Sequence, residues 1–251
     1  MKVVFWNGVG VSNDVTNYMA AIGTILASEF CCEVVLGSNY ISNHMLQDCF
    51  FSKMKEEGIA HAPYCFFHDS SEYSDALWKM KGRRQEDILE RPMEKITVLF
   101  PPDVGERLMF YHEISKQSFY LLEIAEGNYL SFQNALEEAD KIVVFLPQNI
   151  VEIQNFFYRF SPIIPKMIFV LKESSQWNKS LFNKLISEYG INSKNIGSVS
   201  QSNEFNEACV EGKLEAFLKR NRSTRSPHYS FLVGIRRIAN LLFEYKHEKG
   251  V

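Results

Sequence analysis

Residues 2–14 are Lys2-Val3-Val4-Phe5-Trp6-Asn7-Gly8-Val9-Gly10-Val11-Ser12-Asn13-Asp14, and a mostly apolar run, 18–30, follows them. A short apolar run before a glycine-containing turn predicts a buried strand, and the longer run after it predicts a helix. Glycines allow backbone N–H groups to approach a phosphate, and a helix N-terminus favours an anion. This stretch therefore predicts the strand–turn–helix unit with which α/β proteins hold phosphate, although Val11 stands where such a loop normally carries lysine.

Outward from this unit, apolar strands alternate with helices. Strands are predicted at 2–6, 32–36, 96–100, 119–124, 141–146, 166–171 and 195–199. Helices are predicted at 14–30, 42–55, 104–116, 130–139, 150–160, 180–189, 205–219 and 229–245, with Gly190 as a helix C-terminal cap. This alternation predicts an α/β protein, a three-layer αβα sandwich with a mostly parallel sheet. The segment 56–94 is the least regular, and we interpret it as an excursion of loop and helix.

Length and composition are those of a globular protein with a full core. The chain has 251 residues, of which 46% are hydrophobic and 23% are charged. A basic, polar stretch, 220–227, separates the last helix from the rest. We expect a single domain, 1–251, with the helix 229–245 packed on it.

The charge balance and the apolar runs exclude several classes of protein. A net charge of −3 and a pI near 6.1 lack the strong basic signal of a nucleic-acid-binding protein. No apolar run approaches the ~20 residues of a membrane span, and no basic segment with a cleavage site opens the chain. The last helix places Phe231, Ile235, Ile238, Leu242 and Tyr245 on one face, with Lys246 outside it. That stripe favours docking onto the sheet over peripheral membrane contact, so a cytoplasmic protein is expected.

Cysteine and histidine spacing indicates no metal centre. The five cysteines include no C-x-x-C pair, which favours reduced thiols in a cytosolic protein. His61, Cys65, His68 and Asp69 lie close together, but their irregular spacing favours a surface loop over a metal site. The basic run 79–84 is either a contact for an anionic partner or, as we favour, a solvated face.

Residues 6–12 resemble the deviant phosphate loop of the MinD/ParA branch of P-loop ATPases, K-G-G-x-G-K-T/S. Gly8, Gly10 and the hydroxyl of Ser12 match that loop. Trp6 and Val11 stand at its two lysine positions, and Asn7 stands at its first glycine. Asn17 falls on an asparagine that is common in the following helix of the family.

Three later segments resemble the same family in order. Residues 120–127 resemble its strand ending in an acid and a glycine-bearing switch, with Glu123 and Gly127 at those positions. Residues 135–147 resemble its helix–Ala-Asp–strand–Pro pattern, and 203–212 resemble its late loop and helix near the adenine. The resemblance covers 2–244 and implies the P-loop NTPase fold.

The resemblance also implies a nucleotide site for ATP or ADP with magnesium. The implied nucleotide-binding residues are Asn7, Gly8, Val9, Gly10, Val11, Ser12, Asn13 and Gly127, and the implied magnesium ligands are Ser12 and Glu123. In the family both lysines neutralise charge on the transferred phosphate, and an aspartate readies the attacking water. This chain lacks both lysines and has no carboxylate at 37–39. Glu123 is thus the one candidate catalytic residue, and binding of no nucleotide remains an open alternative.

These residues favour a non-hydrolysing localisation or scaffold factor, expected to form a homodimer as the family does. The altered loop is most similar to the TadZ/CpaE-like branch, which implies a partner in pilus or secretion-system assembly. Two alternatives remain. One is a working ATPase of spatial positioning or partitioning, with a site rebuilt from Ser12, Glu123 and a basic residue such as Lys172. The other is a sheet protein that binds a different anionic ligand.

Overall fold

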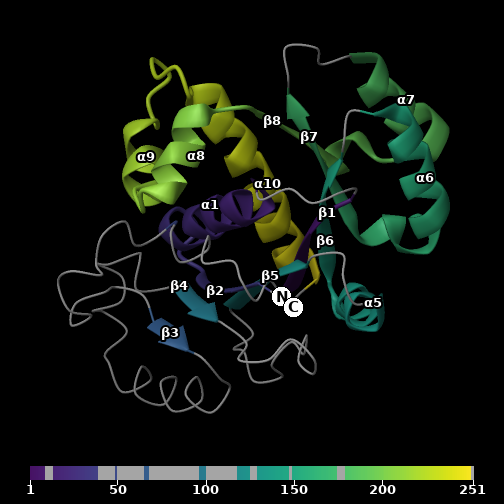
Figure 1. Ribbon diagram of the computed structural model, residues 1–251, viewed down its shortest axis with the longest axis horizontal. Coiled ribbons are helices and arrows are strands. Elements are labelled where there is room, and N and C mark those ends of the chain that lie inside the picture. Colours follow the sequence, from purple (N-terminus) through teal and green to yellow (C-terminus); the bar gives the residue numbers. More distant parts are fainter. Residues whose placement is uncertain are drawn as a thin grey trace.

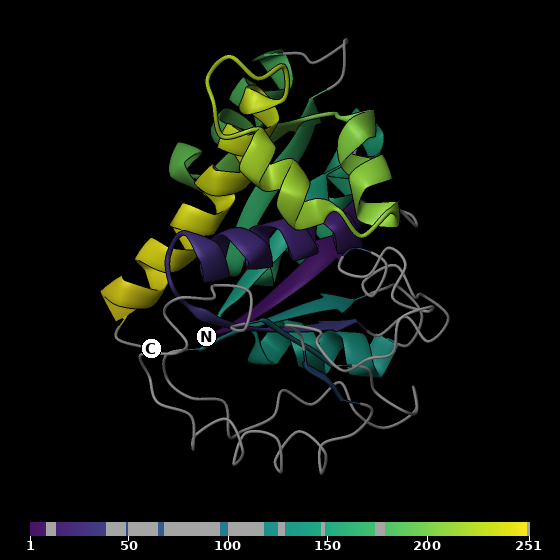
Figure 2. The same ribbon diagram turned by 90° about the vertical axis from the view of Figure 1, so that its left-hand side faces the viewer.

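A computed structural model describes residues 1–8, 14–38, 49, 65–67, 96–99, 118–124, 129–146, 149–173 and 179–249. Within these ranges an eight-stranded sheet forms the centre, and each pair of neighbouring strands runs parallel. Helices cover both faces of the sheet (Figures 1 and 2). The structure confirms the predicted three-layer αβα sandwich.

The strand order places β1 at the centre of the sheet. The strands are β1 (Lys2–Asn7), β2 (Glu33–Ser38), β3 (Cys65–Phe67), β4 (Ile96–Leu99), β5 (Ser118–Ile124), β6 (Lys141–Leu146), β7 (Met167–Glu173) and β8 (Ile196–Ser200), in the order β3-β4-β2-β5-β1-β6-β7-β8. Val4 of β1 pairs with Leu122 of β5 on one side and with Ile142 of β6 on the other. Apolar runs form the central strands because helices cover both of their faces.

The structure describes seven α-helices, and three of their ends have recognisable capping residues. They are α1 (Asp14–Ser28), α5 (Tyr129–Glu138), α6 (Ile150–Phe160), α7 (Lys179–Tyr189), α8 (Asn203–Val210), α9 (Leu214–Arg220) and α10 (Tyr229–Lys249), with 3₁₀ turns at Ser161–Lys166 and Ser193–Asn195. Asn149 caps α6 and Ser202 caps α8 through their side-chain oxygens. Gly190 follows α7 with a φ of +63°, as expected for its predicted role as a C-terminal cap.

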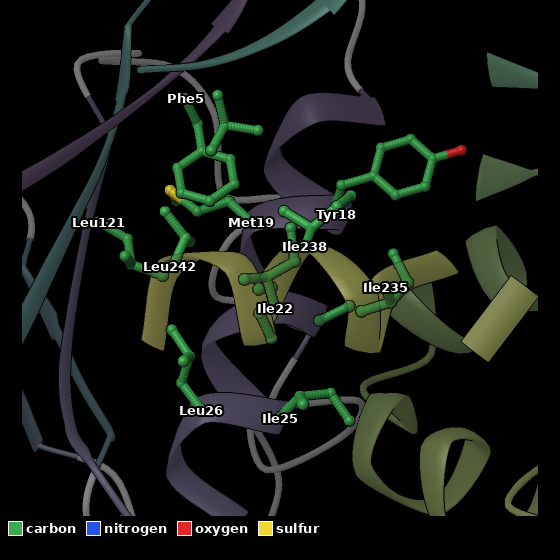
Figure 3. Packing of buried hydrophobic residues seen from close by; sticks show 14 of the residues in the cluster. Phe5, Tyr18, Met19, Ile22, Ile25, Leu26, Leu121, Ile235, Ile238 and Leu242 are labelled. Atoms are coloured by element: carbon green, nitrogen blue, oxygen red, sulfur yellow. The ribbon is translucent and has the colours of Figure 1, made fainter. Parts of the chain in front are cut away.

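Alternate residues of β1 face two separate apolar cores. Val3 and Phe5 pack into a core with α1 and α10, part of which is shown in Figure 3. Val4 and Trp6 point to the opposite face, into a core with α5 and α6.

Two elements differ from the sequence prediction. The predicted helix 205–219 is two helices, because the chain turns at Gly212 with a φ of +64° between α8 and α9. Within 56–94, residues Cys65–Phe67 form β3, which pairs with β4 at the sheet edge. The predicted helix 104–116, and 42–55 apart from residue 49, lie outside the described residues.

Helix α10 lies tightly against the sheet and α1. Four residues of the predicted stripe, Phe231, Ile235, Ile238 and Leu242, are buried, and the last three face α1 in Figure 3. A Cβ placed on Gly234 would lie 2.5 Å from the carbonyl oxygen of Ser198 in β8, so only glycine permits this approach. In the part of the chain that the structure describes, no helix has the length and apolarity to cross a membrane.

Lys246 was predicted outside the apolar stripe of α10, but it is only 7% exposed, and its Nζ lies 4.6 Å from the Phe119 ring centroid. Burial lowers the pKa of Lys246, and the nearby Cys32 and Glu33 oppose that effect. Desolvation of the Lys246 ammonium therefore opposes folding wherever the group is charged.

The stability of Lys246→Met relative to the wild type is expected to be more favourable at pH 7 than at pH 10, because the variant lacks an ammonium whose pKa is lowered by burial. The unfolded state binds more protons between the lowered pKa and the ordinary value of 10.5, so the stability of the wild type rises with pH in that window. The advantage of the variant should shrink accordingly. Guanidinium denaturation at pH 7 and pH 10 measures both, with exposed Lys194→Met as the control. An advantage that grows with pH would contradict this explanation.

Candidate functional site

The carboxyl ends of β1, β5, β6 and β7 lie along one edge of the parallel sheet, and α1 begins at this edge. The chain leaves β1 through α1 towards β2 on one side, whereas α5 leads from β5 to β6 on the other side of β1. Open parallel sheets bind ligands at such a divergence, outside the carboxyl ends of the strands. Residues that end these strands or open α1 therefore form the candidate site.

Trp6 occupies the first lysine position of the resembled phosphate loop, but its side chain lies in the core. It is fully buried, and its ring centroid is 4.6 Å from that of Phe160 and 5.2 Å from that of Phe156. Because Trp6 points to the α5 and α6 face, it is a packing residue of that face rather than a contact for a ligand at the start of α1.

Gly8 is required by the same packing. Its N–H donates to the carbonyl oxygen of Phe145 at 3.2 Å, which continues the pairing of Asn7 with Phe145 in β6. A Cβ at Gly8 would lie 2.9 Å from Val144 Cγ1 and 3.0 Å from Phe156 Cε2. Packing alone thus explains why glycine stands at position 8, whether or not a phosphate binds there.

Glu123, the candidate acid at the end of β5, is 1% exposed and faces the first turn of α1. The hydroxyl of Thr16 lies 2.7 Å from Oε1 and 2.9 Å from Oε2, so it donates across both carboxylate oxygens. A hydrogen bond to a carboxylate in a buried place is strong and fixes its orientation. Thr16 was not predicted; its signal in the sequence is a hydroxyl one helical turn beyond Ser12.

Lys172, at the end of β7, brings a cation to the same edge. Its Nζ lies 3.1 Å from Oδ2 of Asp14, the first residue of α1. Tyr18 lies one turn further along α1, stacked on Phe145 with ring centroids 5.1 Å apart. Burial, and after it the charge of Asp14, raises the pKa of Tyr18 above its usual range, so its hydroxyl stays protonated.

The Asn17 side chain links α1 to two other parts of the chain, α8 and Cys49. Its Nδ2 donates to Oδ1 of Asn206 in α8 at 3.4 Å, and the Cys49 thiol donates to its Oδ1 at 3.3 Å. The structure thus places α1 beside the segment 203–212, and both segments carry residues of the family resemblance.

The remaining predicted site residues lie outside the described residues. These are Val9, Gly10, Val11, Ser12, Asn13 and Gly127. Of the cluster around His61 and His68, the structure describes only Cys65. Among the described residues, no group of three or more His, Cys, Asp and Glu side chains is placed to hold a metal ion, and Cys31, Cys32, Cys49 and Cys209 are not in disulfides.

Glu123, Thr16 and Lys172 are the described polar side chains at this end of the sheet that could hold magnesium or phosphate. Glu123 and Thr16 supply the oxygen ligands that magnesium prefers, and Lys172 supplies a positive charge for phosphate. Both charged groups already have a protein partner, Thr16 for Glu123 and Asp14 for Lys172. The arrangement is compatible with a bound magnesium nucleotide, whereas the lysine contribution to phosphoryl transfer from position 6 is absent.

No protein-family model and no curated protein matches the sequence. Solved structures match the fold. A ParA family ATPase from Chlorobium tepidum has a TM-score of 0.59 at 12% identity, covering 95% of this chain and 98% of that chain. MinD from Pyrococcus horikoshii, complexed with Mg-ADP, has a TM-score of 0.57 at 11% identity, and the match covers 96% of this chain and 95% of that chain. A chain of the MinC:MinD cell division protein complex of Aquifex aeolicus has a TM-score of 0.54 at 14% identity, and the match covers 97% of this chain and 95% of that chain.

The parallel sheet, with α1 starting at the carboxyl end of its central strand, therefore has the same α/β fold as these ParA and MinD structures. The likeness extends over nearly the whole chain, as the sequence resemblance implied. At 11–14% identity it shows the fold and not the activity.

Proposed function

We propose that the protein is a degenerate ParA/MinD-like protein that acts by binding, as a localisation or scaffold factor, and does not hydrolyse nucleotide. The observation that carries this proposal is the position of Trp6. At the first lysine position of the loop, the chain has an aromatic side chain packed against Phe156 and Phe160. No rearrangement short of opening that core presents a cation from this position.

The acid and the cation at the sheet edge support the same proposal. Glu123 is buried under Thr16, and Lys172 is paired with Asp14. Val11 removes the second lysine of the loop. Phosphoryl transfer depends on positive charge that stabilises the transferred group, so a site with these substitutions retains binding contacts and loses most of the rate.

The nucleotide that suits the site is ATP or ADP with magnesium. The backbone of Asn7, Gly8, Val9, Gly10, Val11, Ser12 and Asn13, together with Gly127, would hold the phosphates. Ser12 and Glu123 would hold magnesium, directly or through water, and the ion would neutralise phosphate charge. The solved Pyrococcus MinD with Mg-ADP supports this choice of ligand.

The proposed role is to position another assembly. The MinC:MinD complex shows that a protein of this fold binds a partner protein. We extend this to a cytoplasmic protein of one domain, 1–251, that forms a homodimer and binds a partner in pilus or secretion-system assembly, as the TadZ/CpaE-like loop suggests.

A second candidate function is an ATPase with a rebuilt site in spatial positioning or partitioning. The observation that favours it is Lys172, whose ammonium lies 3.1 Å from the first residue of α1. In this candidate Lys172 replaces the missing loop lysine, and Glu123 orients the attacking water.

Calorimetric titration with Mg-ATP and Mg-ADP, with phosphate release followed in the same samples, tests the proposal. We expect saturable binding without phosphate release above a protein-free blank, and a dimer by light scattering. Turnover that Glu123→Gln abolishes would establish the second candidate. Failure of both nucleotides to bind would remove the nucleotide from the proposal and leave a scaffold or a protein for another anionic ligand.

A further inference from the structure

Lys172 lies in an enclosed, aromatic environment at the end of β7. Its Nζ is 5.9 Å from the ring centroid of Tyr18 and 6.0 Å from that of Phe145. The side chain is 19% exposed. An ammonium held this close to apolar surface needs an anion or an electron-rich ring to offset its lost hydration.

Asp14 supplies that anion, but the two partners are unequal. The Asp14 side chain is 40% exposed, about twice the fraction of Lys172. Asp14 also opens α1, where the N-terminal end of the helix stabilises a negative charge without help from a lysine. The carboxylate can therefore leave the pair for water at little cost, whereas Lys172 cannot.

We propose that Asp14 stands in for a ligand phosphate, and that a bound nucleotide displaces the Asp14 carboxylate from Lys172. This inference rests on the proposed nucleotide binding, and it identifies Asp14 as the group that lowers the affinity for nucleotide. In the exchange, Asp14 turns to solvent and Lys172 passes from one anion to another. A partly exposed ion pair contributes little to stability, so the exchange does not oppose folding.

The consequence is a built-in competition for Lys172. A ligand that needs Lys172 binds only to molecules in which Asp14 does not occupy the lysine. Its apparent affinity is therefore lowered in proportion to the fraction of such molecules. Asp14→Asn removes the competing charge and keeps a residue type favoured at a helix N-terminus. We expect the dissociation constant for Mg-ADP to fall about threefold in this variant, because the competing ion pair is weak. It should rise about tenfold or more in Lys172→Met, as loss of one charged contact implies.

Calorimetry on the wild type, Asp14→Asn, Lys172→Met and the double variant tests the inference, with Mg-ADP and adenosine as the two probes. Adenosine has no phosphate, so its affinity should be the same in all four proteins. Glu188→Gln is the matched control, because it removes one carboxylate from the partly exposed pair with Lys184, 3.4 Å apart at the far end of α7. It should leave Mg-ADP binding unchanged.

The double variant separates competition from simple repulsion. If Asp14 acts by occupying Lys172, the gain from Asp14→Asn disappears once Lys172 is replaced, which is a coupling between the two sites. An equal gain in the Lys172→Met background, or an equal gain for adenosine, would overturn the inference.

The inference and the proposed function fail in different ways. Mg-ADP binding by the wild type that Asp14→Asn does not improve would overturn the inference and leave the proposed binding intact. Binding by Asp14→Asn alone would support the inference, because the wild-type site would then be closed by its own carboxylate. Absence of binding in both proteins would overturn the inference and the proposed nucleotide together.

Discussion

Trp6→Lys is expected to destabilise the protein severely rather than restore a phosphate site. The substitution removes an aromatic side chain with 0% exposure from between Phe156 and Phe160, and loss of such a side chain costs about 3–5 kcal/mol. The new ammonium must also be desolvated in that core or pull the strand apart. Because domains are stable by only about 5–15 kcal/mol, most of the folded population should be lost.

Guanidinium denaturation followed by circular dichroism measures this effect, with Trp6→Phe as the matched control. Phenylalanine keeps the ring contacts and loses only part of the volume, so we expect about 1–2 kcal/mol for that variant. A Trp6→Lys protein that unfolds at the wild-type denaturant concentration and binds Mg-ATP more tightly would contradict the packing role of Trp6.

Thr16→Val is expected to cost about 2–3 kcal/mol of stability, the range for loss of a buried hydrogen bond to a charged group. The change preserves shape but removes the hydroxyl that lies 2.7 Å and 2.9 Å from the two oxygens of Glu123. With Glu123 only 1% exposed, water does not replace the lost donor without local opening.

A matched control lies in the same helix. Thr24 is also buried, but its hydroxyl donates to the carbonyl oxygen of Ala20 within α1 at 2.8 Å, so Thr24→Val should cost less than about 1 kcal/mol. Thermal denaturation of both variants and of Glu123→Gln measures the difference. Equal costs at positions 16 and 24 would show that Thr16 does not hold the Glu123 carboxylate.

Much of the fold could be predicted from local sequence because buried parallel strands are continuous apolar runs. The run 141–146 is predicted with the observed bounds, and every one of its residues is buried. The three-residue strand Cys65–Phe67 lies in an irregular polar region, and nothing local distinguishes it from a loop. The break between α8 and α9 was missed because the apolar spacing continues across Gly212, whose positive φ ends the first helix.

The positions of the candidate site residues along the chain could be predicted from the sequence, but the contacts between their side chains could not. The resemblance placed Glu123 at the end of a strand, but its partner Thr16 is separated from it by 107 residues. Asp14 and Lys172 are separated by 158 residues, and only the strand order brings β7 and the start of α1 to one edge. That position 6 holds no lysine was visible in the sequence, whereas the contacts of Trp6 with Phe156 and Phe160 required the structure.

The described contacts hold the side chains at the carboxyl ends of the strands in place, within a fold like that of ParA and MinD. Trp6 and Gly8 hold β1 against α6, Thr16 holds Glu123, and Asp14 holds Lys172. Among the described residues at this end of the sheet, Glu123 and Lys172 each have a partner within the protein. Binding is proposed to remain, through exchange of one such partner, while the rate of hydrolysis is lost.

The central claim, binding without turnover, is tested most directly by the fate of bound nucleotide. The wild type and Glu123→Gln are each loaded with Mg-ATP, freed of unbound nucleotide, and sampled over hours for the identity of what they hold. We expect ATP to be recovered intact from both proteins, with the same rate of loss. Conversion to ADP in the wild type that is absent in Glu123→Gln would contradict it and establish an enzyme with a rebuilt site.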